Sequence, residues 1–188
     1  MAASHGAYDQ EIRGGRPVVS LLRDPRDVLV SFWLHQPRQF KRFSGDLSSF
    51  IRHEKYGIHF LLSYQGSWAD ATLAKRTLVT TYEDLHADAP TALRAVCVFL
   101  EIPASEQEIS AAAVSGSFDR MQALELSGGI AGHRYDRSDE SALRVRRGLV
   151  RGYQEHLCAA DEMCIGSIIE GPAAGVRTML ERTGYRPR

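Results

Sequence analysis

A short apolar run followed at once by a helix start constrains the fold of this chain more than any other feature. Residues 16–22 (RPVVSLL) are rich in β-branched side chains, a pattern typical of a strand buried on both faces of a parallel sheet. Asp24 suits the N-cap that follows, Pro25 suits the first helical position, and Asp27 is placed to close a capping box. Strand, sharp turn and helix in this order predict an α/β unit.

The rest of the chain favours the same fold class. Residues 77–82 (TLVTTY) form a second β-branched run bounded by charge, which predicts a second buried strand. Residues 36–45 are basic and contain aromatics, and residues 127–139 are Gly-rich, so both are expected to be loops near a site. Apolar residues at helical spacing predict helices from Asp24 to Pro37 and over 47–53, 58–73, 90–100, 105–114, 118–124, 156–169 and 176–182.

Length and charge limit the classes of protein to consider. The 188 residues suffice for one buried core, so we expect a single domain over 1–188. The 23 basic residues balance the 23 acidic residues, which argues against nucleic acid or a membrane surface as a partner. Any anion binding must therefore come from a local cluster. Arginine, which grips oxyanions through two parallel hydrogen bonds, supplies all the basic residues except Lys41, Lys55 and Lys75.

Cysteine usage and hydropathy narrow the possibilities further. The three cysteines form no C-x-x-C pair and lie near no histidine at metal-ligand spacing, so neither a disulfide framework nor a metal site is expected. No apolar stretch approaches 18 residues, and the first 15 residues contain no apolar segment. We therefore expect no membrane span, no signal peptide and a cytoplasmic protein.

The strand-turn-helix over residues 16–31 is the first candidate site. A helix N-terminus beside the carboxyl end of a parallel strand offers free N–H groups to a phosphate. Arg23 stands at the strand end, where its guanidinium can chelate a phosphate, and Ser31 lies two turns into the helix with a hydroxyl to donate. The alternative is that Arg23 and Arg26 pair with neighbouring aspartates as surface charges.

Residues 23–31 (RDPRDVLVS) resemble the R-[DN]-P-[RK]-D-x-x-x-S motif of the sulfotransferases that use 3′-phosphoadenosine 5′-phosphosulfate (PAPS). In that family the leading Arg and the Ser hold the 3′-phosphate, which implies this role for Arg23 and Ser31. Residues 81–85 (TYEDL) are similar to the family's Y-E-D-L/M motif at a strand end. The resemblance implies that Tyr82 contacts the adenine; a half-buried aromatic at a strand end is the alternative.

Two further motifs follow in the family's order. Residues 115–121 (SGSFDRM) are similar to its T-S-F-x-x-M helix start, with Gly116 in place of Thr, which implies that Ser117 touches the adenine. The R-R-G sequence resembles its R-K-G loop and implies that Arg146, Arg147 and Gly148 clasp the 3′-phosphate. The resemblance covers most of the chain and implies the family's P-loop-NTPase-like, three-layer α/β/α fold with a parallel central sheet.

A catalytic base is also implied by the resemblance. Ser4-His5 stand at the distance before Arg23 at which bacterial members carry a K-[ST]-H segment, with Ala3 in place of Lys. A neutral imidazole suits removal of a proton from an acceptor hydroxyl, so His5 is the candidate base. A disordered histidine near the chain start is the alternative. The six other histidines show no partner pattern and are expected to be surface or satisfied residues.

The implied reaction is sulfuryl transfer from PAPS, as cosubstrate, to a hydroxyl or amine of a small-molecule acceptor without a metal. One element is missing: the family's P-K-[ST]-G-[TS]-[TS] loop, which cradles the 5′-phosphosulfate and supplies a catalytic Lys, has no match in the sequence. Its loss should remove most of the rate and expose the strands beside it. Three explanations stay open: a start codon farther upstream, completion of the fold by another chain, or an inactive, truncated remnant that binds 3′,5′-ADP or a protein partner. Oligomeric state is likewise open.

Overall fold

The computed structural model describes residues 16–35, 43–72, 77–127, 145, 147–171 and 174–186. Several predictions concern positions outside these ranges and keep that status. They are the base at His5, the phosphate contact of Arg146, and most of the loops over 36–45 and 127–139.

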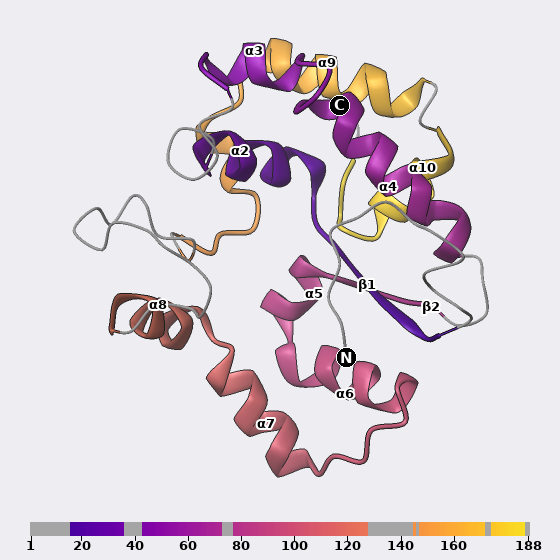
Figure 1. The fold of residues 1–188 in the computed structure, drawn as a ribbon, viewed down its shortest axis with the longest axis vertical. Helices are drawn as coiled ribbons and strands as arrows, with labels where there is room; N and C mark the ends of the chain where they lie inside the picture. Colours follow the sequence, from indigo (N-terminus) through magenta and orange to yellow (C-terminus); the bar gives the residue numbers. More distant parts are fainter. Residues whose placement is uncertain are drawn as a thin grey trace.

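Two parallel strands form the centre of the described structure (Figure 1). Strand β1 (Val18–Leu22) pairs with strand β2 (Thr77–Thr81), with Val18 opposite Thr77 and Leu22 opposite Thr81. Helix α2 (Pro25–His35) follows β1 after two residues, and helix α5 (Tyr82–Ala87) follows β2 directly. The predicted α/β unit and parallel pairing are confirmed.

Helices lie on both sides of the strands. On one side are α2, α3 (Leu47–Ile51), α4 (Ile58–Thr72), α9 (Ala159–Glu170) and α10 (Ala174–Glu181), and on the other are α5, α6 (Ala89–Phe99), α7 (Glu106–Ser115) and α8 (Phe118–Ser127) (Figure 1). A short 3₁₀ helix, η3 (Gly152–Glu155), precedes α9. Every helix predicted from the sequence is present, with ends shifted by a few residues.

Helix α5 was not predicted. The residues from Tyr82 to Ala87 look like the end of a strand followed by a polar loop, yet they form a helix whose N-cap is Thr81. The Thr81 hydroxyl accepts a hydrogen bond from the Asp84 N–H at 2.9 Å and so satisfies one of the free donors at the helix start. Tyr82 is therefore the first residue of a helix rather than the last of a strand.

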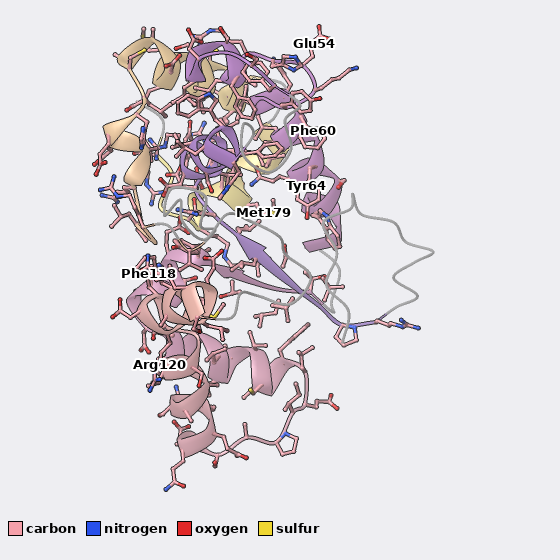
Figure 2. All side chains as sticks on the ribbon, turned by 60° about the vertical axis from the view of Figure 1, so that its left-hand side comes forward. Glu54, Phe60, Tyr64, Phe118, Arg120 and Met179 are labelled. Carbon is pink, nitrogen blue, oxygen red and sulfur yellow. The ribbon has the colours of Figure 1, made fainter. Side chains whose placement is uncertain are left out.

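The apolar core belongs almost entirely to one helix layer. Side chains with essentially no exposed surface come from α3, α4, α9 and α10 and include Phe50, Ile51, Ile58, Ile165, Ile169 and Leu180. Figure 2 shows Met179 of α10 where this layer meets the strands. The opposite layer buries little, since α6 has no buried residue and α7 buries only Ile109.

The prediction that β1 is buried on both faces is wrong. Leu21 is 58% exposed, and Leu22 is the one fully buried residue of the strand. Two features account for this exposure: within the described ranges β1 pairs only with β2, and the helix layer that contains the core covers one face. No helix in the same ranges combines the length and apolarity needed to cross a bilayer.

The turn between β1 and α2 contains a buried ion pair. Arg26 Nη2 lies 2.6 Å from Asp24 Oδ2, and both side chains are less than a tenth exposed. The Arg26 guanidinium also lies 4.2 Å from the ring centre of Tyr153 and 4.8 Å from that of Tyr185. The interpretation of Arg26 as a surface charge is therefore wrong, because the aromatic rings of the C-terminal third cover it.

The predicted capping box at Asp27 is also wrong. The N–H of Asp24, which a capping box would satisfy from within the helix, donates instead to Glu83 Oε1 at 3.0 Å. The carboxylate of Asp27 accepts from the backbone of Arg151 and Tyr153. Both groups of the expected local capping box are therefore bonded to segments distant in the sequence.

Replacing Arg26 with leucine should lower the free energy of unfolding by about 3 kcal/mol, because it leaves the Asp24 carboxylate buried without its cation. Urea unfolding followed by circular dichroism measures this loss. Arg94→Leu is the matched control, since the Arg94–Glu106 pair is exposed and its loss should change stability little. Equal effects of the two substitutions would contradict a structural role for Arg26.

Candidate functional site

A cavity of about 330 Å³ lies where the carboxyl ends of the two strands meet the helices that follow them. Its walls come from the end of β1 and from α2, from the start of α5, from the α7–α8 junction, and from residues 147–156. Segments far apart in the sequence thus meet at one edge of the sheet. This edge is where open α/β folds bind ligands.

Five of the eight predicted site residues line this cavity: Arg23, Ser31, Tyr82, Arg147 and Gly148. Ser117 does not; it is exposed beside the cavity, between two residues that do line it. It precedes α8, and its backbone carbonyl accepts from the Met121 N–H at 2.9 Å. Its adenine contact remains a prediction. His5 and Arg146 lie outside the described residues.

The sequence did not reveal three histidines of the cavity wall. His35 ends α2, His86 lies in α5, and His156 follows η3. The ring of His86 lies 4.5 Å from that of Tyr82. These residues come from separate elements and share no spacing. The only signal in the sequence is that they follow Arg23, Tyr82 and Arg147, respectively, within a short stretch of chain. The expectation that they are surface or satisfied residues did not place them at this cavity.

Arg23 is held in place by three contacts. Its Nη2 donates to the Leu149 carbonyl at 3.0 Å and lies 3.7 Å from Asp27 Oδ2, while its Cζ lies 4.1 Å from the ring centre of Tyr82. Its Nε is buried and has no hydrogen-bond partner among the described residues. Arg23 therefore combines a fixed position with an unsatisfied donor, which suits it to an anionic ligand.

Tyr82 contributes an aromatic face and a neutral phenol. Burial raises its pKa, and the Arg23 guanidinium only partly offsets this effect. The phenol therefore keeps its proton at neutral pH and can donate a hydrogen bond.

Arg147 is paired before any ligand binds. Its guanidinium makes two parallel hydrogen bonds to the Glu155 carboxylate, with Nη2 at 3.0 Å from Oε1 and Nη1 in contact with Oε2. The bond to Glu155 raises the pKa of Arg147. Both side chains are nearly half exposed, so the pair is weak and a phosphate could compete with Glu155 for Arg147.

Gly148 has a geometric reason to be glycine. Its φ is +60°, and a Cβ there would lie 2.3 Å from Cδ2 of Phe118. Phe118 lies at the start of α8, at the end nearer the strands, whereas Arg120 lies farther from them (Figure 2). The close approach of Gly148 to this ring joins residues 147–153 to α8.

Gly148→Ala should lower the free energy of unfolding by more than the roughly 1–2 kcal/mol cost of a left-handed backbone, because the methyl group also displaces Phe118. Gly116→Ala is the control within the same cavity. Gly116 has an ordinary φ of −87°, and its added Cβ would meet nothing closer than 3.5 Å. Urea unfolding compares the two variants, and equal stabilities would contradict the assigned geometry.

Glu83, next to Tyr82 in the sequence, has a partly unpaired, half-buried carboxylate. Its Oε1 accepts from the Asp24 N–H, whereas its Oε2 is buried with no hydrogen-bond partner in the described ranges. Burial raises the pKa of Glu83 above its ordinary value of 4.5. Ionising Glu83 therefore costs the folded state more than the unfolded state. That cost is absent below pH 4.5, where both states are protonated, and is fully present above the raised pKa.

Glu83→Gln should therefore change the free energy of unfolding more favourably at pH 8 than at pH 4, when each value is compared with that of the unchanged protein at the same pH. Chemical unfolding at both pH values measures this difference. Glu106→Gln should show the opposite trend, because the hydrogen bond from Arg94 lowers the pKa of Glu106, so that its charge stabilises the fold at high pH. The same trend in both variants would contradict the burial argument.

Comparison with known proteins identifies the family. Residues 16–174 match the sulfotransferase domain. The chain belongs to this family. It is 23% identical over 176 residues to cytosolic sulfotransferase 15 of Arabidopsis thaliana, covering 86% of this chain and 47% of the relative. It is 28% identical over 122 residues to sulfotransferase 2B1 of Rattus norvegicus, covering 58% and 34%. The chain thus spans half or less of these sulfotransferases.

Solved structures agree on the fold. Mouse sulfotransferase SULT7A1 complexed with PAP superposes with a TM-score of 0.68 at 19% identity, covering 88% of this chain and 62% of that chain. A retinol dehydratase in complex with androsterone and the inactive cofactor PAP superposes with a TM-score of 0.63 at 20% identity, covering 90% and 49%. The predicted α/β sulfotransferase fold with a parallel sheet is confirmed.

A metal site is not apparent in the part of the chain that the structure describes. There, no three His, Cys, Asp or Glu side chains gather closely enough to hold an ion.

Proposed function

We propose that this sulfotransferase domain binds PAPS through its 3′-phosphate and adenosine and transfers the sulfuryl group to a hydroxyl or amine of a small-molecule acceptor. The observation that carries the proposal is the meeting of Arg23, Ser31 and Arg147 around one cavity. They lie on a strand end, a helix and a distant loop, and each was singled out from the sequence as a ligand of one phosphate. PAP in the two related crystal structures supports the choice of nucleotide.

The donor set fits a phosphate. In the proposed complex the guanidinium groups of Arg23 and Arg147 and the Ser31 hydroxyl surround the 3′-phosphate, and Gly148 lets the backbone approach it. Arg146 joins them from the same R-R-G sequence. Three arginines directed at one dianion explain how a chain without net charge binds an anion.

The adenine end of the ligand lies, in this proposal, between Tyr82 and the start of α8. Tyr82 offers its ring and a protonated phenol, and Ser117 offers a hydroxyl at the helix start. The Tyr82 ring also stacks against the Arg23 guanidinium. In this proposal one aromatic ring therefore orients both the adenine and the arginine that binds the 3′-phosphate.

The reaction is a group transfer. An acceptor oxygen or nitrogen forms a bond to sulfur while the bond from sulfur to the 5′-phosphate oxygen breaks, and 3′,5′-ADP leaves with that electron pair. His5 takes the acceptor proton in this proposal. A cytoplasmic location belongs to the same proposal, since the Arabidopsis relative is named as cytosolic.

Saturating 3′,5′-ADP at about 100 times its dissociation constant should stabilise the fold by about 2.7 kcal/mol, and 5′-AMP at the same concentration should stabilise it clearly less. Thermal unfolding with each nucleotide measures the difference. Arg23→Ala should abolish it, whereas the control Arg94→Ala should keep it, because Arg94 does not line the cavity and pairs with Glu106. Equal stabilisation by both nucleotides would refute the 3′-phosphate assignment.

Turnover needs a separate assay, because no segment of this sequence matches the 5′-phosphosulfate loop. Transfer of labelled sulfate from PAPS to phenols, alcohols and amines is followed, with His5→Ala as the comparison. Transfer that depends on His5 supports the full proposal. Nucleotide binding without transfer would instead support the alternative of an inactive, nucleotide-binding relative.

A further inference from the structure

The chain segment that carries Arg147 and Gly148 is anchored on both sides by buried carboxylates. Its described residues are Val145 and 147–153. Both Gly148 and Arg151 have left-handed backbone conformations, with φ of +60° and +63°. For the arginine such a conformation is uncommon and costs energy, so the surrounding structure must impose it.

Asp27 provides the anchor on the C-terminal side. Its carboxylate accepts from the Arg151 N–H through Oδ2 and from the Tyr153 N–H through Oδ1, both at 2.8 Å, across more than 120 residues of sequence. Asp27 is only 3% exposed. The left-handed Arg151 directs these two N–H groups toward one point, which is the kind of concave backbone surface that binds anions. Here the protein's own carboxylate fills it.

Arg23 strengthens this anchor. Its Nη2 donates to the Leu149 carbonyl and lies beside the carboxylate of Asp27. Asp27 therefore contacts the 147–153 loop directly, and it also lies next to Arg23, which contacts the same loop. The spacing between Arg23 and the 147–153 loop is set by these contacts.

Helix α8 provides the anchor on the N-terminal side. Glu125 has no exposed surface, and its Oε2 accepts from the Val145 N–H at 2.8 Å. Gln122, one turn earlier, donates from Nε2 to the Val145 carbonyl at 3.1 Å. Both backbone polar groups of Val145, two residues before Arg147, are thus held by α8.

Burial of two carboxylates is costly unless each makes good hydrogen bonds. Asp27 lines the cavity and lies beside Arg23, but the nucleotide site proposed above gives neither Asp27 nor Glu125 a contact with the ligand. What the two have in common is the segment they hold. A loop fixed before binding loses less conformational entropy when the ligand arrives.

We propose that Asp27 and Glu125 are positioning residues that hold Val145 and residues 147–153 in the shape that presents Arg147 and Gly148 to the 3′-phosphate. This inference rests on the proposed function for its effect on ligand binding. Its structural part, the selective ordering of the segment, does not depend on which ligand binds.

Asp27→Asn and Glu125→Gln test the proposal, because each keeps the shape of the side chain and replaces one acceptor oxygen by a donor. Hydrogen–deuterium exchange is measured on the full chain and compared with Asp161→Asn. Asp161 is an equally buried carboxylate, held by Arg52 and Ser48 away from the cavity. We expect exchange to rise selectively over 145–153 in the two site variants and to stay unchanged there in the control. Exchange that is unchanged, or raised equally throughout the molecule, would overturn the proposal.

Nucleotide binding provides the second measurement. Each site variant should weaken 3′,5′-ADP binding by about tenfold, the worth of one hydrogen bond to a charged group, and 5′-AMP binding much less. Asp161→Asn should leave both affinities unchanged. Site variants that keep full affinity for 3′,5′-ADP would overturn the positioning role. If the unchanged protein does not distinguish the two nucleotides, the proposed function fails, and the exchange data still decide the anchoring.

Gln122→Met keeps the test decisive if either carboxylate variant fails to fold. It removes only the hydrogen bond to the Val145 carbonyl, from a half-buried side chain. Faster exchange around Val145 and weaker 3′,5′-ADP binding are expected, in smaller measure. No change in either would contradict the anchor on α8.

Discussion

The ion pair between Asp24 and Arg26 determines how the two ends of the described chain meet. It is buried at the start of α2, where the Arg26 guanidinium lies against the rings of Tyr153 and Tyr185. A buried cation needs both its carboxylate and a shell that excludes water, and the C-terminal third provides that shell. The same turn bears Arg23, which lines the cavity and is the candidate anion-binding residue.

Several charged groups around the cavity are satisfied by contacts within the described part of the protein. Arg147 is bound to Glu155, Asp27 is occupied by two backbone N–H groups, and Glu125 holds another. A neutral chain can thus concentrate positive charge locally without the arginines repelling one another. In an exposed ion pair such as Arg147–Glu155, a ligand can take the place of one partner, whereas the buried carboxylates hold the backbone. The site therefore combines exchangeable charges that face the cavity with fixed charges behind them.

Much of this arrangement could be predicted from the sequence. The strand-turn-helix at residues 16–35, the second strand and the remaining longer helices follow from apolar spacing and capping residues, and four motifs in order gave the family. Helix α5 was missed because Thr81 serves both as the last strand residue and as an N-cap. The burial of β1 was overestimated, because a β-branched run predicts a strand but says nothing of which layers cover it.

The alternation of charges from Arg23 to Asp27 shows where sequence ends and tertiary structure begins. By itself the sequence determined a strand end, a helix start and the presence of two arginines and two aspartates within five residues. Spacing could not say which arginine is structural, since both have an acidic neighbour within reach. The tertiary structure decided it: Arg26 turns into the core under aromatic rings from residues 153 and 185, while Arg23 lies at the cavity beside Tyr82. Only contacts between residues more than fifty positions apart create that difference in environment.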